Sequence, residues 1–245
     1  MFSVVGATLS LVVRPSTWTR PVREALAQQI LQTAIYAIPF TLLTALAIAV
    51  FVVLQAQQWL DRLGHTSLLG PLLVVAVVRE LGPLITNLLV IGRSGSGMTS
   101  ELASMKASGE VNLLDAQGVD PFVYLVVPRV LGTGIAVLCL TVILLLTSFV
   151  AGRLLMVMIS SDPTPLVTFA DQVLKSLEVV DLFNFLAKTL LTGMLTGAIC
   201  CVTGLHAVGQ ASAVTSAPRA AFVRSIAALL IVSVFVSAVI YLGGG

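Results

Sequence analysis

The feature that most restricts the fold of this chain is a long uncharged segment near its N-terminus. No Asp, Glu, Lys or Arg occurs between Glu24 and Asp61. The apolar part of this segment, about residues 30–54, is long enough to cross a bilayer, which takes about 20 apolar residues in a helix. Hydrophobic residues make up 58% of the chain and charged residues 10%, against about 25% in an average soluble domain. A soluble domain of 245 residues could not bury so much apolar surface, so we expect an integral membrane protein.

Four further apolar stretches follow, at about residues 68–91, 130–152, 189–208 and 225–242. Each is long enough to span a bilayer as a helix, and Pro39 should kink the first span. None shows the alternation of apolar and polar residues that is typical of a strand in a membrane barrel. We therefore predict an all-α integral membrane protein with five transmembrane helices, in a single domain that covers residues 1–245.

The flanks of these stretches predict how the chain lies in the membrane. With the N-terminus in the cytoplasm, the cytoplasmic segments carry more Lys and Arg than the outer segments, as the positive-inside rule favours. The C-terminus is then on the outer side. Residues 1–26 contain Trp18 beside Arg14, Arg20 and Arg23, a composition typical of a helix in the inner interface. A weakly ordered terminus is the alternative.

Two long segments connect the predicted spans. The inner one, residues 97–120, is rich in helix formers, and Gly109 should divide its helix. Gly118 and the Asp120-Pro121 pair should end it. The outer one, residues 160–182, contains Thr164-Pro165, which favours the start of a short amphipathic helix.

Arg79 and Glu80 are two adjacent charges in the middle of the second span. Each central charge costs about 2.5–3.5 kcal/mol on the insertion scale, so the pair should face protein or a water-filled cavity. Pro83 has no N–H, so the carbonyl of Arg79 loses its donor within the helix. Asn87 lies on the same helical face as Glu80. The pattern indicates either a polar patch in a substrate cavity or a buried ion pair that fixes helix packing.

The segment Gly92–Thr99 nearly fits the phosphate-binding pattern GxxxxGK[ST], but Met98 stands where the lysine is required. This excludes a nucleotide site there. The same segment contains a GxSG string with Ser94, and His206 lies far downstream, so an intramembrane serine hydrolase is an alternative function. Small residues that permit close helix packing explain the string more simply. The three cysteines, Cys139, Cys200 and Cys201, have no zinc-site spacing, and we expect no metal.

A series of motifs in this order resembles the signature of the MlaE/YrbE permeases, the membrane subunits of ABC transporters that work with MCE-domain proteins. The motifs are Arg79-Glu80-Leu81-Gly82-Pro83, Gly92-Arg93-Ser94-Gly95-Ser96, Glu101-Leu102, Met105-Lys106, Glu110, Gly118-Val119-Asp120-Pro121 and Pro128-Arg129. The pattern Gln55, Leu60, Gly64 after the first span agrees with the same family. An acidic residue that is common in the family's fifth span is absent here.

The resemblance implies a homodimeric permease that moves phospholipids or related lipids between the bacterial inner membrane and a periplasmic MCE-protein path, maintaining outer-membrane lipid asymmetry. It also implies a cytoplasmic ABC ATPase subunit, a periplasmic MCE-domain protein and, in some systems, a STAS-domain protein. The chain itself would need no cofactor, because the ATPase binds ATP, and no nucleic acid. The implied lipid-cavity residues are Arg79, Glu80, Asn87 and Gln55. The implied ATPase-coupling residues are Glu101, Met105, Lys106, Glu110, Asp115 and Asp120.

A third possible function is an ion-coupled carrier that uses Arg79 and Glu80. Such carriers usually contain two related halves, and five spans cannot be divided evenly. The permease is the function that we predict.

Overall fold

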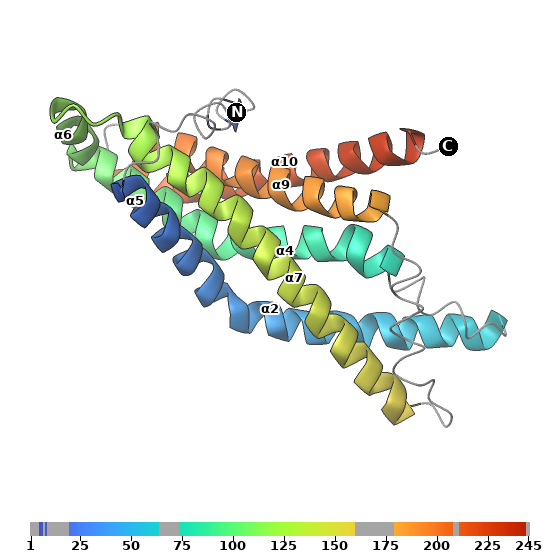
Figure 1. Cartoon of the computed structure of the whole chain (residues 1–245). Helices are drawn as coiled ribbons and strands as arrows, with labels where there is room; N and C mark the ends of the chain where they lie inside the picture. Colours follow the sequence, from blue (N-terminus) through green and yellow to red (C-terminus); the bar gives the residue numbers. More distant parts are fainter. Residues whose placement is uncertain are drawn as a thin grey trace.

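A computed structural model describes residues 5–6, 8, 20–63, 74–159, 179–207 and 211–243, and the regular elements of this part of the chain are helices. The first pass is α2 (Arg20–Leu63) and the second runs through the π-helical η3 (Val74–Leu81), α4 (Gly82–Val90), the π-helical η4 (Ile91–Gly95) and α5 (Ser96–Ala107). After α6 (Glu110–Ala116) come the π-helical η5 (Phe122–Val126), α7 (Val127–Ile159), α9 (Val179–Leu205) and α10 (Ala211–Gly243). Successive passes run between the same two ends of an elongated bundle (Figure 1). We call the end that carries α6 the α6 end.

Within the described residues, 4 helices are long and apolar enough to cross a membrane: Arg20–Gln55, Phe122–Met158, Val180–Leu205 and Thr215–Val239. The predicted second span, residues 68–91, begins outside the described part and is not one of them. Its described part is divided into short segments and carries Arg79 and Glu80. The predicted second span, and with it the count of five spans, therefore stays a prediction.

The N-terminal boundary differs from the expectation. Of the interfacial helix expected over residues 1–26, residues 20–26 belong to α2, which is continuous for 44 residues from Arg20 into the first span. Residues 1–4, 7 and 9–19 lie outside the described part of the chain. The Ala, Leu, Gln and Glu residues that follow Arg20 favour helix, so nothing ends the helix before the span. Figure 1 shows α2 bending along its length, and Pro39 lies inside it, where a proline removes a helical hydrogen bond.

The inner connecting segment also starts differently from the prediction. Residues 97–107 belong to α5, which continues the second pass instead of beginning a separate helix. The predicted division at Gly109 is confirmed, because this residue has a φ of 83°, in the left-handed region that glycine favours. Gly118, with a φ of 78°, follows α6. Residues 160–178 of the predicted outer segment lie outside the described part of the chain.

Helices α7 and α9 pack closely against each other. Glycines bring the two backbones together: a Cβ built on Gly193 would lie 2.9 Å from Cα of Gly134. In its most apolar window, α9 is 72% buried and α10 only 22%. Helices α2 and α10 expose rows of large apolar side chains, as expected of surfaces that face lipid or another subunit. These include Tyr36, Leu43, Phe51, Ile231, Val234 and Phe235.

Candidate functional site

The charges of the second pass pair with α9, not with each other. Arg79 Nε lies 2.6 Å from Asp181 Oδ1, and Arg79 Nη2 donates to Asp181 Oδ2 at 2.9 Å. This is a close ion pair with one charge-assisted hydrogen bond, from Nη2. Asp181 is in the first turn of α9, where the helix dipole favours a negative charge. Of the two interpretations of these charges, the alternative of an ion pair between the neighbours Arg79 and Glu80 is therefore wrong, because the packing of α9 supplies a separate partner for each.

Glu80 and Lys188 form the second pair. Lys188 Nζ lies 2.7 Å from Glu80 Oε1 and also donates to the main-chain carbonyl of Arg79 at 3.1 Å. This carbonyl is the one that Pro83 was predicted to leave without a donor in its own helix. Ser237 Oγ of α10 donates to the same Glu80 oxygen at 3.0 Å. One carboxylate thus joins the second pass to both α9 and α10.

The burial of this network is uneven. The side chain of Lys188 is 1% exposed, whereas that of Glu80 is 41% exposed. Asp181 is buried and Arg79 is partly buried. The cations are therefore held within the protein, and the most accessible charged group of the network is the Glu80 carboxylate.

Sequence reasoning missed Asp181 and Lys188, which it took for residues outside or at the edge of the fourth span. Both carry charge, and they are 7 positions apart in the chain (188 − 181), so they share one face of a helix. Two charges on one face of an otherwise apolar helix are the signal that could have found them.

The two other predicted cavity residues are not joined to this network by any interaction in the described part of the chain. Asn87 is fully buried, and its Nδ2 donates to the Pro83 carbonyl at 2.8 Å. Its Oδ1 is buried without a described partner. Gln55 lies on α2 and is exposed.

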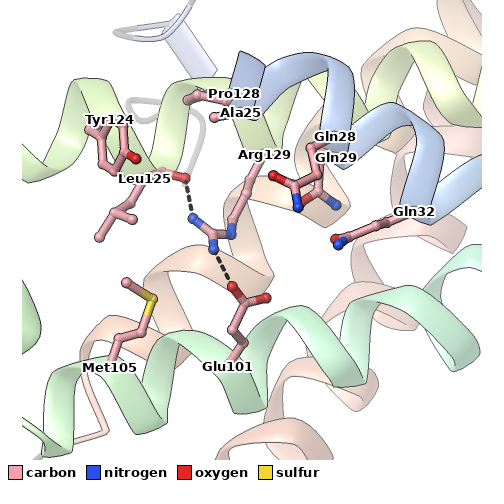
Figure 2. Close-up of a pocket in the computed structure, with 10 residues that line it drawn as sticks. All are labelled: Ala25, Gln28, Gln29, Gln32, Glu101, Met105, Tyr124, Leu125, Pro128 and Arg129. Atoms are coloured by element: carbon pink, nitrogen blue, oxygen red, sulfur yellow. Dashed lines mark hydrogen bonds and ion pairs between the residues drawn. The ribbon is translucent and has the colours of Figure 1, made fainter. Parts of the chain in front are cut away.

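The predicted coupling residues gather at the α6 end. Glu101 and Met105 of α5 line a pocket of about 220 Å³ with Arg129 and Tyr124 (Figure 2). Arg129 Nη2 donates to Glu101 Oε1 at 2.7 Å. Figure 2 shows three glutamine side chains of α2 on the opposite wall, namely Gln28, Gln29 and Gln32.

The other four coupling candidates lie on or beside α6. Lys106 Nζ donates to Asn112 Oδ1 at 3.2 Å, and Glu110 accepts a hydrogen bond from Ser108 Oγ at 3.0 Å. Asp120 Oδ1 accepts from the main-chain N–H of Phe122 at 2.9 Å, which holds the start of η5. Asp115 is exposed. Asp120 is thus the candidate with an evident role in the local fold.

Ser94 and His206 do not form a catalytic pair in the described part of the chain. His206 follows the last residue of α9, and its Nδ1 lies 2.8 Å from the Val202 carbonyl of its own helix. Among the described residues, no hydrogen bond joins His206 to Ser94 of η4. A general base must reach the hydroxyl that it deprotonates, so this arrangement gives the hydrolase alternative no support.

Comparison with known proteins places the chain in a family. A family model described as Permease MlaE matches residues 26–239. A probable ABC transporter permease protein of Rickettsia typhi is 26% identical over 98% of this chain and 90% of its own length. A probable ABC transporter permease protein of Synechocystis is 29% identical over 83% of this chain and 77% of its own length.

A plant protein is also similar. The chloroplastic protein Trigalactosyldiacylglycerol 1 of Arabidopsis thaliana is 28% identical over 89% of this chain and 62% of its own length. The predicted resemblance is therefore confirmed over most of the sequence, and the described helices supply the apolar spans that such a subunit needs. This chain belongs to the MlaE permease family and is a multi-pass membrane permease of the ABC transporter type.

Proposed function

We propose that this permease moves phospholipids or related lipids between the bacterial inner membrane and a periplasmic MCE-domain protein that leads to the outer membrane. In this role it would maintain the lipid asymmetry of the outer membrane. The name of the Arabidopsis relative contains a galactolipid, which supports a lipid as the substrate class.

The observation that carries the proposal is the placement of Glu80. Its carboxylate is 41% exposed, in the middle of an apolar segment, and it is held by Lys188 and Ser237. Large apolar side chains are exposed close to Ser237 along α10, including Val234 and Phe235. A water-soluble substrate would need a continuous polar path. A few polar atoms beside a wide apolar surface suit an amphiphile with a polar head and acyl chains.

The same surfaces support the homodimer that we propose. The most apolar window of α10 is only 22% buried in one chain, and α2 is exposed in a similar way. Two copies related by a twofold axis would bring these faces together and enclose a central cavity near Arg79 and Glu80. In this arrangement Gln55 and Asn87 would lie toward the same cavity.

We propose the remaining protein partners from the exposed surfaces of the chain and from its family. A cytoplasmic ABC ATPase would dock on α5 and α6 through Glu101, Met105, Lys106, Glu110, Asp115 and Asp120. Exposed Leu113 on α6 adds apolar area to that polar surface. The N-terminus would lie in the cytoplasm and the C-terminus in the periplasm, where an MCE-domain protein covers the outer face. Some complexes would also contain a STAS-domain protein.

The test is reconstitution of the permease with its ATPase in vesicles that contain a tail-labelled phospholipid. We expect ATP-dependent transfer of this lipid to or from the purified MCE-domain protein, and no transfer with a non-hydrolysable ATP analogue. A complex that hydrolyses ATP but moves only a water-soluble solute would overturn the lipid assignment.

A further inference from the structure

Arg93 is held against an aromatic ring at the α6-end half of the second pass. Its guanidinium carbon lies 4.7 Å from the centre of the Phe40 ring. Phe40 belongs to α2, directly after Pro39, and is 52% exposed; Arg93 is exposed as well. A cation over a ring face is fixed in position while the N–H donors at the guanidinium edge stay available.

In the described part of the chain, Arg93 has no acidic partner that would neutralise it. No salt bridge joins Arg93 to a carboxylate in the part of the chain that the structure describes. The adjoining segments, residues 26–55, 81–100 and 215–239, contain no Asp or Glu at all. The same segments contain two further exposed arginines on α10, Arg219 and Arg224. The charge of Arg93 is therefore not balanced by a carboxylate of these segments, which favours an anion as its ligand.

The neighbours of Arg93 are apolar and aromatic. Gly92 faces α10, where a Cβ on Gly92 would lie 3.8 Å from a ring carbon of Phe222. Phe222 and Phe40 are both partly exposed on the two helices that flank η4. An anion that binds here with its attached chains would find a guanidinium for its charge and apolar helix faces for the chains.

Arg79 is poorly suited to the same task. Its guanidinium is already paired with Asp181 through Nε and Nη2. Arg93 is 13 residues after Glu80 (93 − 80), which is about 20 Å along a helix toward the α6 end. Arg93 and the neighbours Arg79 and Glu80 would therefore contact a lipid at different depths in the membrane.

We propose that Arg93, positioned by Phe40, binds the phosphate group of a phospholipid whose acyl chains lie against α2 and α10. This rests on the proposed lipid function and adds to it a phosphate-bearing head group and a binding position on the α6-end half of the bundle. Arg–phosphate pairs are charge-assisted and geometrically matched, which explains why an arginine stands here.

The test compares two lipids that differ only in the phosphate. Phosphatidylglycerol and a diacylglycerol with the same acyl chains are titrated into the purified permease complex, and the bound species are measured by native mass spectrometry. We expect Arg93→Ala to weaken phosphatidylglycerol binding about tenfold, the size of one charge-assisted hydrogen bond, and to leave diacylglycerol binding unchanged. Arg93→Lys should retain part of the affinity, and Phe40→Leu should lower it in the same selective way.

The matched control is Arg20→Ala, because Arg20 is a highly exposed arginine on α2 that pairs with Glu24. It should leave the binding of both lipids unchanged.

If Arg93→Ala assembles poorly, binding is measured with Phe40→Leu and Arg93→Lys. Unchanged phosphatidylglycerol binding in both of these variants overturns the inference. Unchanged binding in a well-folded Arg93→Ala does the same while the lipid function stands. Wild-type protein that binds neither lipid contradicts the proposed function itself. Full competition by soluble glycerol 3-phosphate identifies a site for phosphate alone and overturns the lipid assignment of Arg93.

Discussion

Lys188 of α9 donates a hydrogen bond to the main-chain carbonyl of Arg79, 3.1 Å away, while its charge is paired with Glu80. The same ammonium group thus supplies the hydrogen bond to the Arg79 carbonyl that Pro83 cannot donate. It also neutralises the Glu80 carboxylate. Since Lys188 is 1% exposed, it has no access to water as a substitute partner. The second pass and α9 are therefore joined by backbone as well as side-chain contacts.

Replacing Lys188 by Met should destabilise the protein strongly. The change keeps the length of the side chain but leaves the Arg79 carbonyl and Glu80 without their partner. We expect a loss of about 3 kcal/mol, the lower end of the range for breaking a buried pair, because Glu80 is partly exposed. Thermal unfolding in detergent measures it. The double variant Lys188→Met with Glu80→Gln should recover part of the loss, and an additive double variant would contradict the pairing.

Two charge exchanges distinguish the observed pairing from a pair between neighbours. Arg79→Glu with Glu80→Arg would place a carboxylate beside Asp181 and a guanidinium beside Lys188, so we expect it to be less stable than either single variant. Arg79→Asp with Asp181→Arg should be more stable than either of its single variants. Melting temperature and lipid bound per chain are measured for all of them. Recovery by the first exchange, and not by the second, would contradict the observed network.

Charge reversal at Glu101 tests the proposed docking surface. The Glu101 side chain is 55% exposed, so breaking its pair with Arg129 should cost at most about 1 kcal/mol of stability. We expect Glu101→Lys to reduce the amount of ATPase that co-purifies with the permease. Arg129→Gln is the matched control, because it breaks the same ion pair but keeps the exposed carboxylate, and it should keep the ATPase bound. Equal loss of ATPase in both variants would assign the effect to the ion pair instead.

The close contact of α7 and α9 predicts a difference between two glycines. A Cβ on Gly193 would lie 2.9 Å from Cα of Gly134, which is backbone and cannot rotate away. We expect Gly193→Ala to destabilise the protein by about 1–3 kcal/mol through overpacking. Gly97 of α5 has no heavy atom within 4 Å of such a Cβ. Gly97→Ala should therefore be neutral or slightly stabilising in the same thermal assay, because alanine favours helix. Equal melting temperatures for the two variants would show that the helices separate easily.

Ser94→Ala should be almost silent in lipid transfer. Within the described residues Ser94 has no hydrogen bond to His206, so this histidine is not placed to activate its hydroxyl as a nucleophile. Wild-type protein should likewise resist labelling by a fluorophosphonate probe. Labelling at Ser94, together with loss of function in the alanine variant, would favour the hydrolase over the permease.

The sequence by itself determined the features that depend on composition and on neighbouring residues. Apolar runs of this length require a membrane, and their lack of alternation favours helices, which satisfy their own backbone hydrogen bonds in the bilayer. The division at Gly109 follows from one left-handed residue, and the carbonyl freed beside Pro83 follows from one missing N–H. The motif order from Arg79 to Arg129 was sufficient to identify the family.

The tertiary structure alone decided which charges meet. Arg79 and Asp181 are 102 residues apart in the chain, and Glu80 and Lys188 are 108 apart. Their contact depends on how α9 is rotated and shifted against the second pass, which the side chains of several helices set together. The same holds for the contacts of Arg93 with Phe40 and of Glu101 with Arg129. A local pattern states that a buried charge needs a partner, but only the packing of distant helices determines which residue that partner is.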